Sequence, residues 1–182
     1  RLLSSAASDV YKRQVVLKYG KLQEDAFKEP GGNKLRKWID DCPNQLYSAL
    51  IFEGGEAFKK RVLDDIGDQS EISNLINKRS DSEFLELMSN LGGHCISTIC
   101  ESFNKIKNDK PTAFIAYTIK GWGTPLAGHK DNHAGLMTIA QMKDFKSKLE
   151  INDGEEWNNF SDDKKHLNIC LLYTSDAADE RR

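Results

Sequence analysis

Apolar residues recur every three or four positions through the first half of the chain, which is the spacing of one helix face. Glycine and proline at 30–32, 43 and 54–55 separate the predicted helices. The periodic positions are Leu35, Trp38, Ile39 and Cys42, then Phe58, Val62 and Ile66, and finally Phe84, Leu85, Leu87 and Met88 behind a Ser80–Glu83 capping box. The range of about 29–90 is therefore expected to be a helical insertion that serves as scaffold.

The pattern changes on either side of this insertion. A short apolar run at 15–18 is typical of the end of a buried strand, and residues 112–119 are apolar on both faces and rich in strand formers. Between them a predicted helix ends before Pro111, and its apolar face carries Ile96, Ile99, Cys100, Phe103 and Ile106. This order of strand, helix and strand predicts an α/β fold with part of a doubly wound parallel sheet. In such sheets, ligands bind beyond the carboxyl ends of the strands.

The segment at 120–137 follows the second predicted strand and is too long for a plain connection. It holds four glycines, which permit close approach of the backbone to a ligand. Lys120 could neutralise a phosphate or a carboxylate, and His129 and His133 could exchange protons near neutral pH. A solvated lysine and a metal site at 129–133 are the alternatives; Lys130 within the cluster disfavours the metal site.

Two features flank this loop. A Thr138–Gln141 capping box predicts a last helix, whose inward residues are expected to be Ile139, Met142, Phe145 and Leu149. His94 follows two glycines and is interpreted as a local hydrogen-bonding residue rather than a catalytic one.

Composition excludes several classes of protein. A formal net charge of −2 with 30% charged residues is ordinary for a soluble protein, and no basic cluster indicates a nucleic-acid partner. No apolar run is as long as a membrane span. Cys42, Cys95 and Cys100 lack the spacing of a metal site, so they are interpreted as small buried residues in a reducing cytoplasm.

The two ends of the chain are related through their DNA. The strings SSAASDVYKRQ at 4–14 and CLLYTSDAADE at 170–180 can be encoded by opposite strands of one segment. Residues 1–14 and 170–182 are therefore expected to be scars of a sequencing adapter that make few buried contacts. The native part is expected to comprise a domain at 15–160 and the start of a linker at 161–169, open at both ends.

Several strings in this native part resemble one family. KPTAFIAYTIKGWG at 110–123 resembles the strand and loop that close the diphosphate-binding domain of the transketolase superfamily, and AGHKDNHAG at 127–135 resembles the transketolase histidine loop. EPGGNKLRKWIDDCPN at 29–44 and NLGGH at 90–94 are similar to the homodimeric pyruvate dehydrogenase first component. The resemblance covers nearly all of 15–159 and is closest to that group.

The resemblance implies a fragment of an enzyme that decarboxylates a 2-oxo acid through thiamine diphosphate and transfers the acyl unit to a lipoyl group. It implies that Lys120 approaches the cofactor, that His133 acts in acid–base transfer, and that His129 orders the loop. Asn132 and Lys130 are expected to order the loop or contact substrate. The implied partners are a second copy in a homodimer and the lipoyl-bearing dihydrolipoyl acetyltransferase, all in the cytoplasm.

The resemblance also implies parts that this chain does not carry. The Gly-Asp-Gly motif that holds magnesium and the diphosphate is expected upstream, and the domain with the activating glutamate is expected downstream. The chain alone is therefore expected to be inactive, to bind no thiamine diphosphate, and to contribute no metal ligand. The alternatives are a transketolase, which the helical insertion disfavours, and a non-catalytic α/β module, which the glycine-rich histidine loop disfavours.

Overall fold

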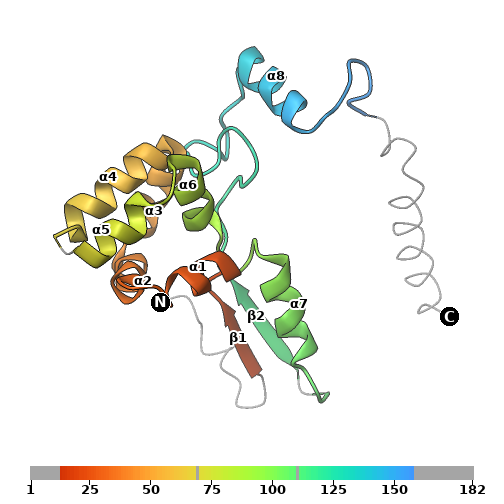
Figure 1. The fold of residues 1–182 in the computed structure, drawn as a ribbon. Coiled ribbons are helices and arrows are strands. Elements are labelled where there is room, and N and C mark those ends of the chain that lie inside the picture. Colours follow the sequence, from red (N-terminus) through yellow and green to blue (C-terminus); the bar gives the residue numbers. More distant parts are fainter. Residues whose placement is uncertain (1–12, 69, 110, 158–182) are drawn as a thin grey trace. The chain divides into compact units, whose positions relative to one another are not determined.

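The computed structural model describes residues 13–68, 70–109 and 111–157, which form an α/β structure that is mostly helical with a small parallel sheet (Figure 1). The elements are β1 (Arg13–Leu17), α1 (Lys21–Ala26), α2 (Gly32–Asp41), α3 (Asn44–Glu53), α4 (Gly55–Ile66), α5 (Ser70–Asn77), α6 (Asp81–Ser89), α7 (Ile96–Asn104), β2 (Thr112–Ala116) and α8 (Ile139–Lys148). The described residues up to 136 belong to one compact unit and the described residues from 137 to another, and each is described by itself. The α/β class expected from the sequence is confirmed.

Helices α2, α3, α4 and α6 meet at one aromatic cluster. Phe58 of α4 is fully buried, and its ring centroid lies 5.8 Å from that of Trp38, 5.3 Å from that of Tyr47 and 6.0 Å from that of Phe84. The capping box expected at Ser80 is present at the start of α6. The helical range and most of its inward residues are confirmed, and α1 is an additional short helix within 21–26.

The two strands pair in parallel with Leu17 opposite Ala116 (Figure 1). The strand expected at 112–119 ends at Ala116, because the carbonyl groups that follow each strand accept hydrogen bonds from the turn before α7. The amides of Gly92 and Gly93 donate to the carbonyls of Lys18 and Tyr117. The expectation of burial on both faces is wrong, since every residue of β2 is half-buried or exposed.

β1 begins inside the segment expected to be an adapter scar. Arg13 and Gln14 are exposed and pair through their backbones with Thr112 and Ala113. The rest of that segment, the linker at 161–169 and the segment at 170–182 lie outside the described residues.

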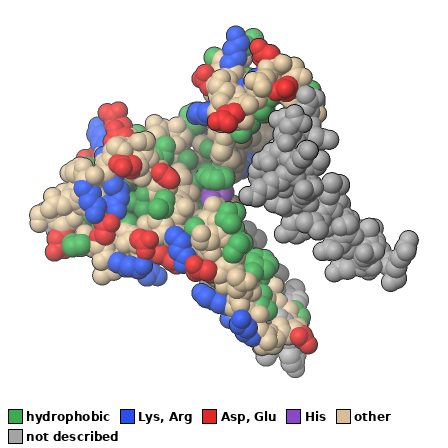
Figure 2. Space-filling model, turned by 45° about the vertical axis from the view of Figure 1, so that its right-hand side comes forward, with side chains coloured by type: hydrophobic (Ala, Val, Ile, Leu, Met, Phe, Trp, Pro, Cys, Tyr) green, Lys and Arg blue, Asp and Glu red, His purple; other side chains and the backbone are tan. Residues whose placement is uncertain are grey.

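Two apolar faces expected to point inward are exposed instead. The buried residues of α7 are Thr98 and Ser102. The Ser102 hydroxyl donates a hydrogen bond of 2.7 Å to the Thr98 carbonyl. The exposed apolar residues include Ile96 and Phe103 in α7, Ile139 and Met142 in α8, and Leu149 directly after α8. Figure 2 shows apolar side chains along the outward face of the arm that contains α7. Periodicity located the apolar residues of these helices, but the expectation that they point inward is wrong for most of them.

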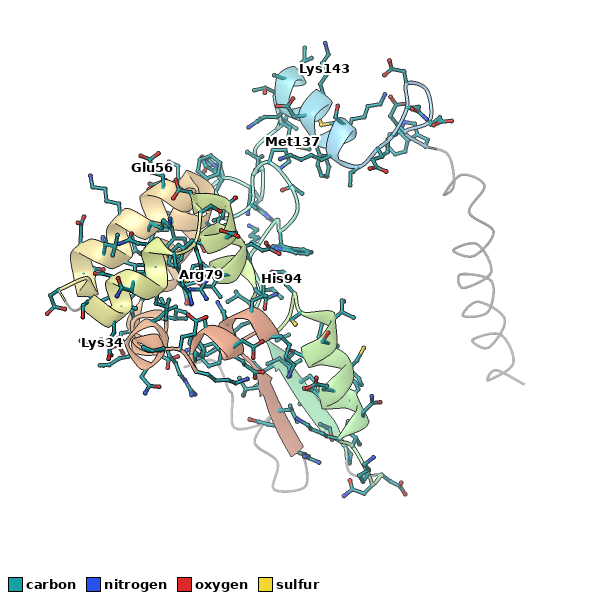
Figure 3. All side chains as sticks on the ribbon, in the orientation of Figure 1. Lys34, Glu56, Arg79, His94, Met137 and Lys143 are labelled. Atoms are coloured by element: carbon teal, nitrogen blue, oxygen red, sulfur yellow. The ribbon has the colours of Figure 1, made fainter. Side chains whose placement is uncertain are left out.

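The turn between α6 and α7 binds both strand ends and the segment after β2. A Cβ atom on Gly92 would lie 2.4 Å from the carbonyl carbon of Leu17, so the turn crosses β1 in backbone contact. His94 follows in this turn (Figure 3), and its Nε2 accepts a hydrogen bond of 2.7 Å from the Ile119 amide. His94 is a hydrogen-bonding residue, as expected, but its partner is distant in the sequence rather than local.

None of the described helices is both long and apolar enough to cross a membrane.

Candidate functional site

The loop after β2 folds back onto its own beginning. The Lys120 carbonyl accepts hydrogen bonds from the Gly128 amide at 3.1 Å and from Asn132 Nδ2 at 2.7 Å. Gly121 and Gly128 have φ angles of 72° and 75°, which residues with a Cβ atom rarely adopt. These glycines allow a long polar loop to close into consecutive turns.

The closed loop docks on α3. A Cβ atom on Gly128 would lie 2.3 Å from the Ser48 carbonyl oxygen, so only glycine fits at this contact. Next to it, the His129 ring packs on Phe52 with centroids 4.4 Å apart and an angle of 58° between the rings. The histidine segment therefore rests on one face of a helix.

Two cavities meet beside this contact. A cavity of ≈ 790 Å³ lies between α3 and the loop, and one of ≈ 550 Å³ lies between α3, the end of α2 and the carboxyl ends of the strands. The residues that line both are Asn44, Ser48 and Lys120. The carboxyl ends of parallel strands are where α/β proteins bind ligands, so this is the candidate functional site.

Two side chains that line the second cavity, Lys18 and Asp40, form an ion pair. Asp40 accepts hydrogen bonds from the Lys18 ammonium and from the Tyr19 hydroxyl. Burial alone would raise the pKa of Asp40, yet these two donors hold it below its ordinary value. In the described part of the chain, Lys18 and Lys130 have carboxylate partners, whereas no ion pair involves Lys120. The Lys120 ammonium is thus the cation best placed for an anionic ligand.

The two loop histidines differ in how firmly they are held. His129 is half-buried, and its Nδ1 accepts a 3.1 Å hydrogen bond from the Asp131 amide. In its neutral form the ring therefore carries its proton on Nε2. His133 is exposed and lines neither of the two cavities.

Only one of the two polar atoms of the Asn132 side-chain amide has a hydrogen-bond partner among the described residues. Its Nδ2 donates to the Lys120 carbonyl, while its Oδ1 is buried and has no hydrogen-bond partner among the described residues. A buried acceptor without a partner costs free energy, so a bound group that donates a hydrogen bond would stabilise the site.

The larger cavity brings together most of the residues that the sequence singled out. Lys120, His129, Lys130 and Asn132 line it, and His133 does not. The sequence analysis missed its other wall, because α3 belongs to the insertion interpreted as scaffold. That wall consists of Asn44, Gln45, Ser48, Ala49, Phe52 and Glu53. The spacing of four between Asn44, Ser48 and Phe52 is the signal that could have identified it.

The described residues fit only part of a magnesium–diphosphate site. The Lys120 side chain and the Asn132 side-chain oxygen Oδ1 suit a polar, anionic group that also donates a hydrogen bond. Among residues 13–68, 70–109 and 111–157, no group of three or more His, Cys, Asp or Glu side chains could hold a metal ion. The chain matches no protein-family model and no curated protein.

Proposed function

We propose that the chain is part of the first component of a thiamine-diphosphate-dependent 2-oxo acid dehydrogenase and forms one wall of its active site. The observation that carries the proposal is the closed loop at 120–135. Its sequence resembles the histidine loop of the transketolase superfamily. It also lies at the carboxyl end of a parallel strand, with Lys120, His129 and Asn132 on one cavity.

The proposed fold is correspondingly part of a doubly wound, diphosphate-binding domain with a helical insertion. β1 and β2 would be two strands of its parallel sheet. The exposed faces of β2 and α7 support this assignment, because a larger sheet and its covering helices would bury them. The proposed setting is a cytoplasmic homodimer that works with a lipoyl-bearing dihydrolipoyl acetyltransferase.

In this proposal several residues of the loop have a chemical task. Thiamine diphosphate, when bound, supplies the electron sink for decarboxylation. Lys120 provides positive charge toward the carboxylate of a 2-oxo acid or toward the diphosphate. His133, exposed on the loop, gives or takes a proton during transfer of the acyl unit, while Asn132 and Lys130 order the loop. Magnesium would depend on ligands outside the described residues.

The proposal is tested on the complete polypeptide that contains residues 15–159. Purified with thiamine diphosphate and magnesium, it should oxidise pyruvate with an artificial electron acceptor and release carbon dioxide. With the acetyltransferase added, it should acetylate lipoyl groups. Transfer of two-carbon units between sugar phosphates without pyruvate oxidation would identify a transketolase. The absence of both activities in a folded protein would refute the proposal and favour the remaining alternative, a non-catalytic α/β module.

A further inference from the structure

The larger cavity has one wall of helix and one wall of loop, and the two are in direct contact at Gly128 and His129. We propose that Phe52 of α3 is a positioning residue that fixes the orientation of His129 in this cavity. The catalytic consequence of this role rests on the proposed function, whereas the positioning itself does not.

The first support is that the backbone before His129 cannot shift freely. Gly128 is buried, donates to the Lys120 carbonyl and touches the Ser48 carbonyl at a distance that leaves no space for a Cβ atom. Interatomic contact on both sides confines the peptide that precedes the histidine. The Cα position of His129 is thereby set relative to α3.

The second support is the ring contact. Phe52 is 43% exposed, and its ring centroid lies 4.4 Å from that of the His129 ring. An inclined pair of rings at this distance is a favourable aromatic geometry. The contact therefore restricts rotation of the imidazole about its side-chain bonds.

The third support is the hydrogen bond on the other edge of the imidazole. Nδ1 accepts from the Asp131 amide, so one nitrogen is occupied and the other carries the proton in the neutral ring. Phe52 on one face and Asp131 at one edge leave Nε2 as the nitrogen available to a ligand. The charged groups that line the same cavity are Glu53, Lys120 and Lys130.

The structure favours His129 over His133 as the oriented histidine of the loop, whereas the sequence analysis favoured His133 as the acid–base group. His133 was expected to be the principal acid–base group, but it is exposed and is held by none of these contacts. His129 is the histidine that the fold orients before any ligand arrives. A preoriented Nε2–H group can donate a hydrogen bond to an oxygen atom of a ligand in the cavity.

The positioning is tested by NMR on the full chain. In the unmodified chain, long-range ¹H–¹⁵N correlations should show His129 protonated on Nε2, with ring protons shifted by the Phe52 ring current. Phe52→Ala should abolish that shift, and Phe52→Tyr should retain it. Phe103→Ala is the matched control, because Phe103 is also about half exposed and stacks on another ring, that of Phe114, away from the cavity. Unchanged His129 signals in Phe52→Ala would overturn the proposal.

The consequence for catalysis is tested in the complete enzyme. Misplacement by about 1 Å of a group that orients the substrate can cost on the order of 10²-fold in rate, so loss of His129 positioning in Phe52→Ala should lower kcat by roughly 10- to 100-fold with little change in KM. Phe52→Tyr should restore the rate, and Phe103→Ala should not alter it. Full activity of Phe52→Ala despite altered His129 signals would refute the catalytic role. Altered signals in a protein without any 2-oxo acid activity would refute the proposed function and leave the positioning intact.

Discussion

His94 offers the sharpest test of how the candidate site is anchored, because one ring joins the turn before α7 to the start of the loop. Its Nε2 accepts the Ile119 amide at 2.7 Å, and its ring stacks on Trp122 with centroids 4.5 Å apart. Ile119 is only 5% exposed, so its amide has little access to water. Loss of the acceptor in His94→Leu should reduce the free energy of unfolding by about 1–3 kcal/mol. His94→Gln, which keeps an acceptor, should lose less.

The same contact predicts a dependence of stability on pH. Burial of the imidazole lowers the pKa of His94 below its ordinary value of 6.5, since the protonated ring is less well solvated and cannot accept the amide. A depressed pKa in the folded state means that the contribution of His94 is complete above about pH 6.5 and is lost as the pH falls below it. Both His94→Gln and His94→Leu should lack this loss.

The assay is urea unfolding followed by far-ultraviolet circular dichroism at pH 7.5 and pH 5.5. The other histidines are the same in all three proteins, so the difference between variants isolates His94. The unmodified chain should lose more stability between the two pH values than either variant. Equal pH dependence in all three proteins would refute the assignment of a neutral, hydrogen-bonded His94.

Two further predictions concern the core and the loop. Phe58→Ala should destabilise the fold by about 3–5 kcal/mol in urea unfolding, because the ring is fully buried, while Phe103→Ala should cost less than half as much. Similar losses for the two would contradict the proposed centre of the core. In the complete enzyme, His133→Ala should slow acyl transfer about 10²–10⁴-fold and affect decarboxylation less. Lys120→Ala should slow both reactions, and full activity of both variants would refute the assigned roles.

The helical insertion could be predicted because its information is local. The spacing of apolar residues around Phe58 and the capping box at Ser80 each act within one or two helical turns. The burial of α7 and α8 could not be predicted in the same way. Periodicity shows that Ile96 and Ile139 lie on apolar faces, but burial depends on which element covers that face.

The site was predicted in part for a related reason. Lys120, His129 and Asn132 are close in sequence and in a loop whose composition is unusual, so they could be selected without a structure. Ser48 and Phe52 lie in an ordinary-looking helix, and their place on the cavity depends on how the loop docks. The docking in turn involves a close backbone contact at Gly128 and the ring contact at His129, which no sequence pattern specifies.

The parallel pairing of β1 with β2 has a consequence for the order of folding. All the helices from α1 to α7 lie between the two strands in sequence, so the pairing must close a loop of this whole length. For a chain of that size the entropic cost of closure is on the order of 4 kcal/mol, whereas the helices between the strands gain contacts from near neighbours. The helical group should therefore form early and the strands should associate late. Lys120 leaves the end of β2 and α3 belongs to the helical group, so the two walls of the cavity would come together only in this late step.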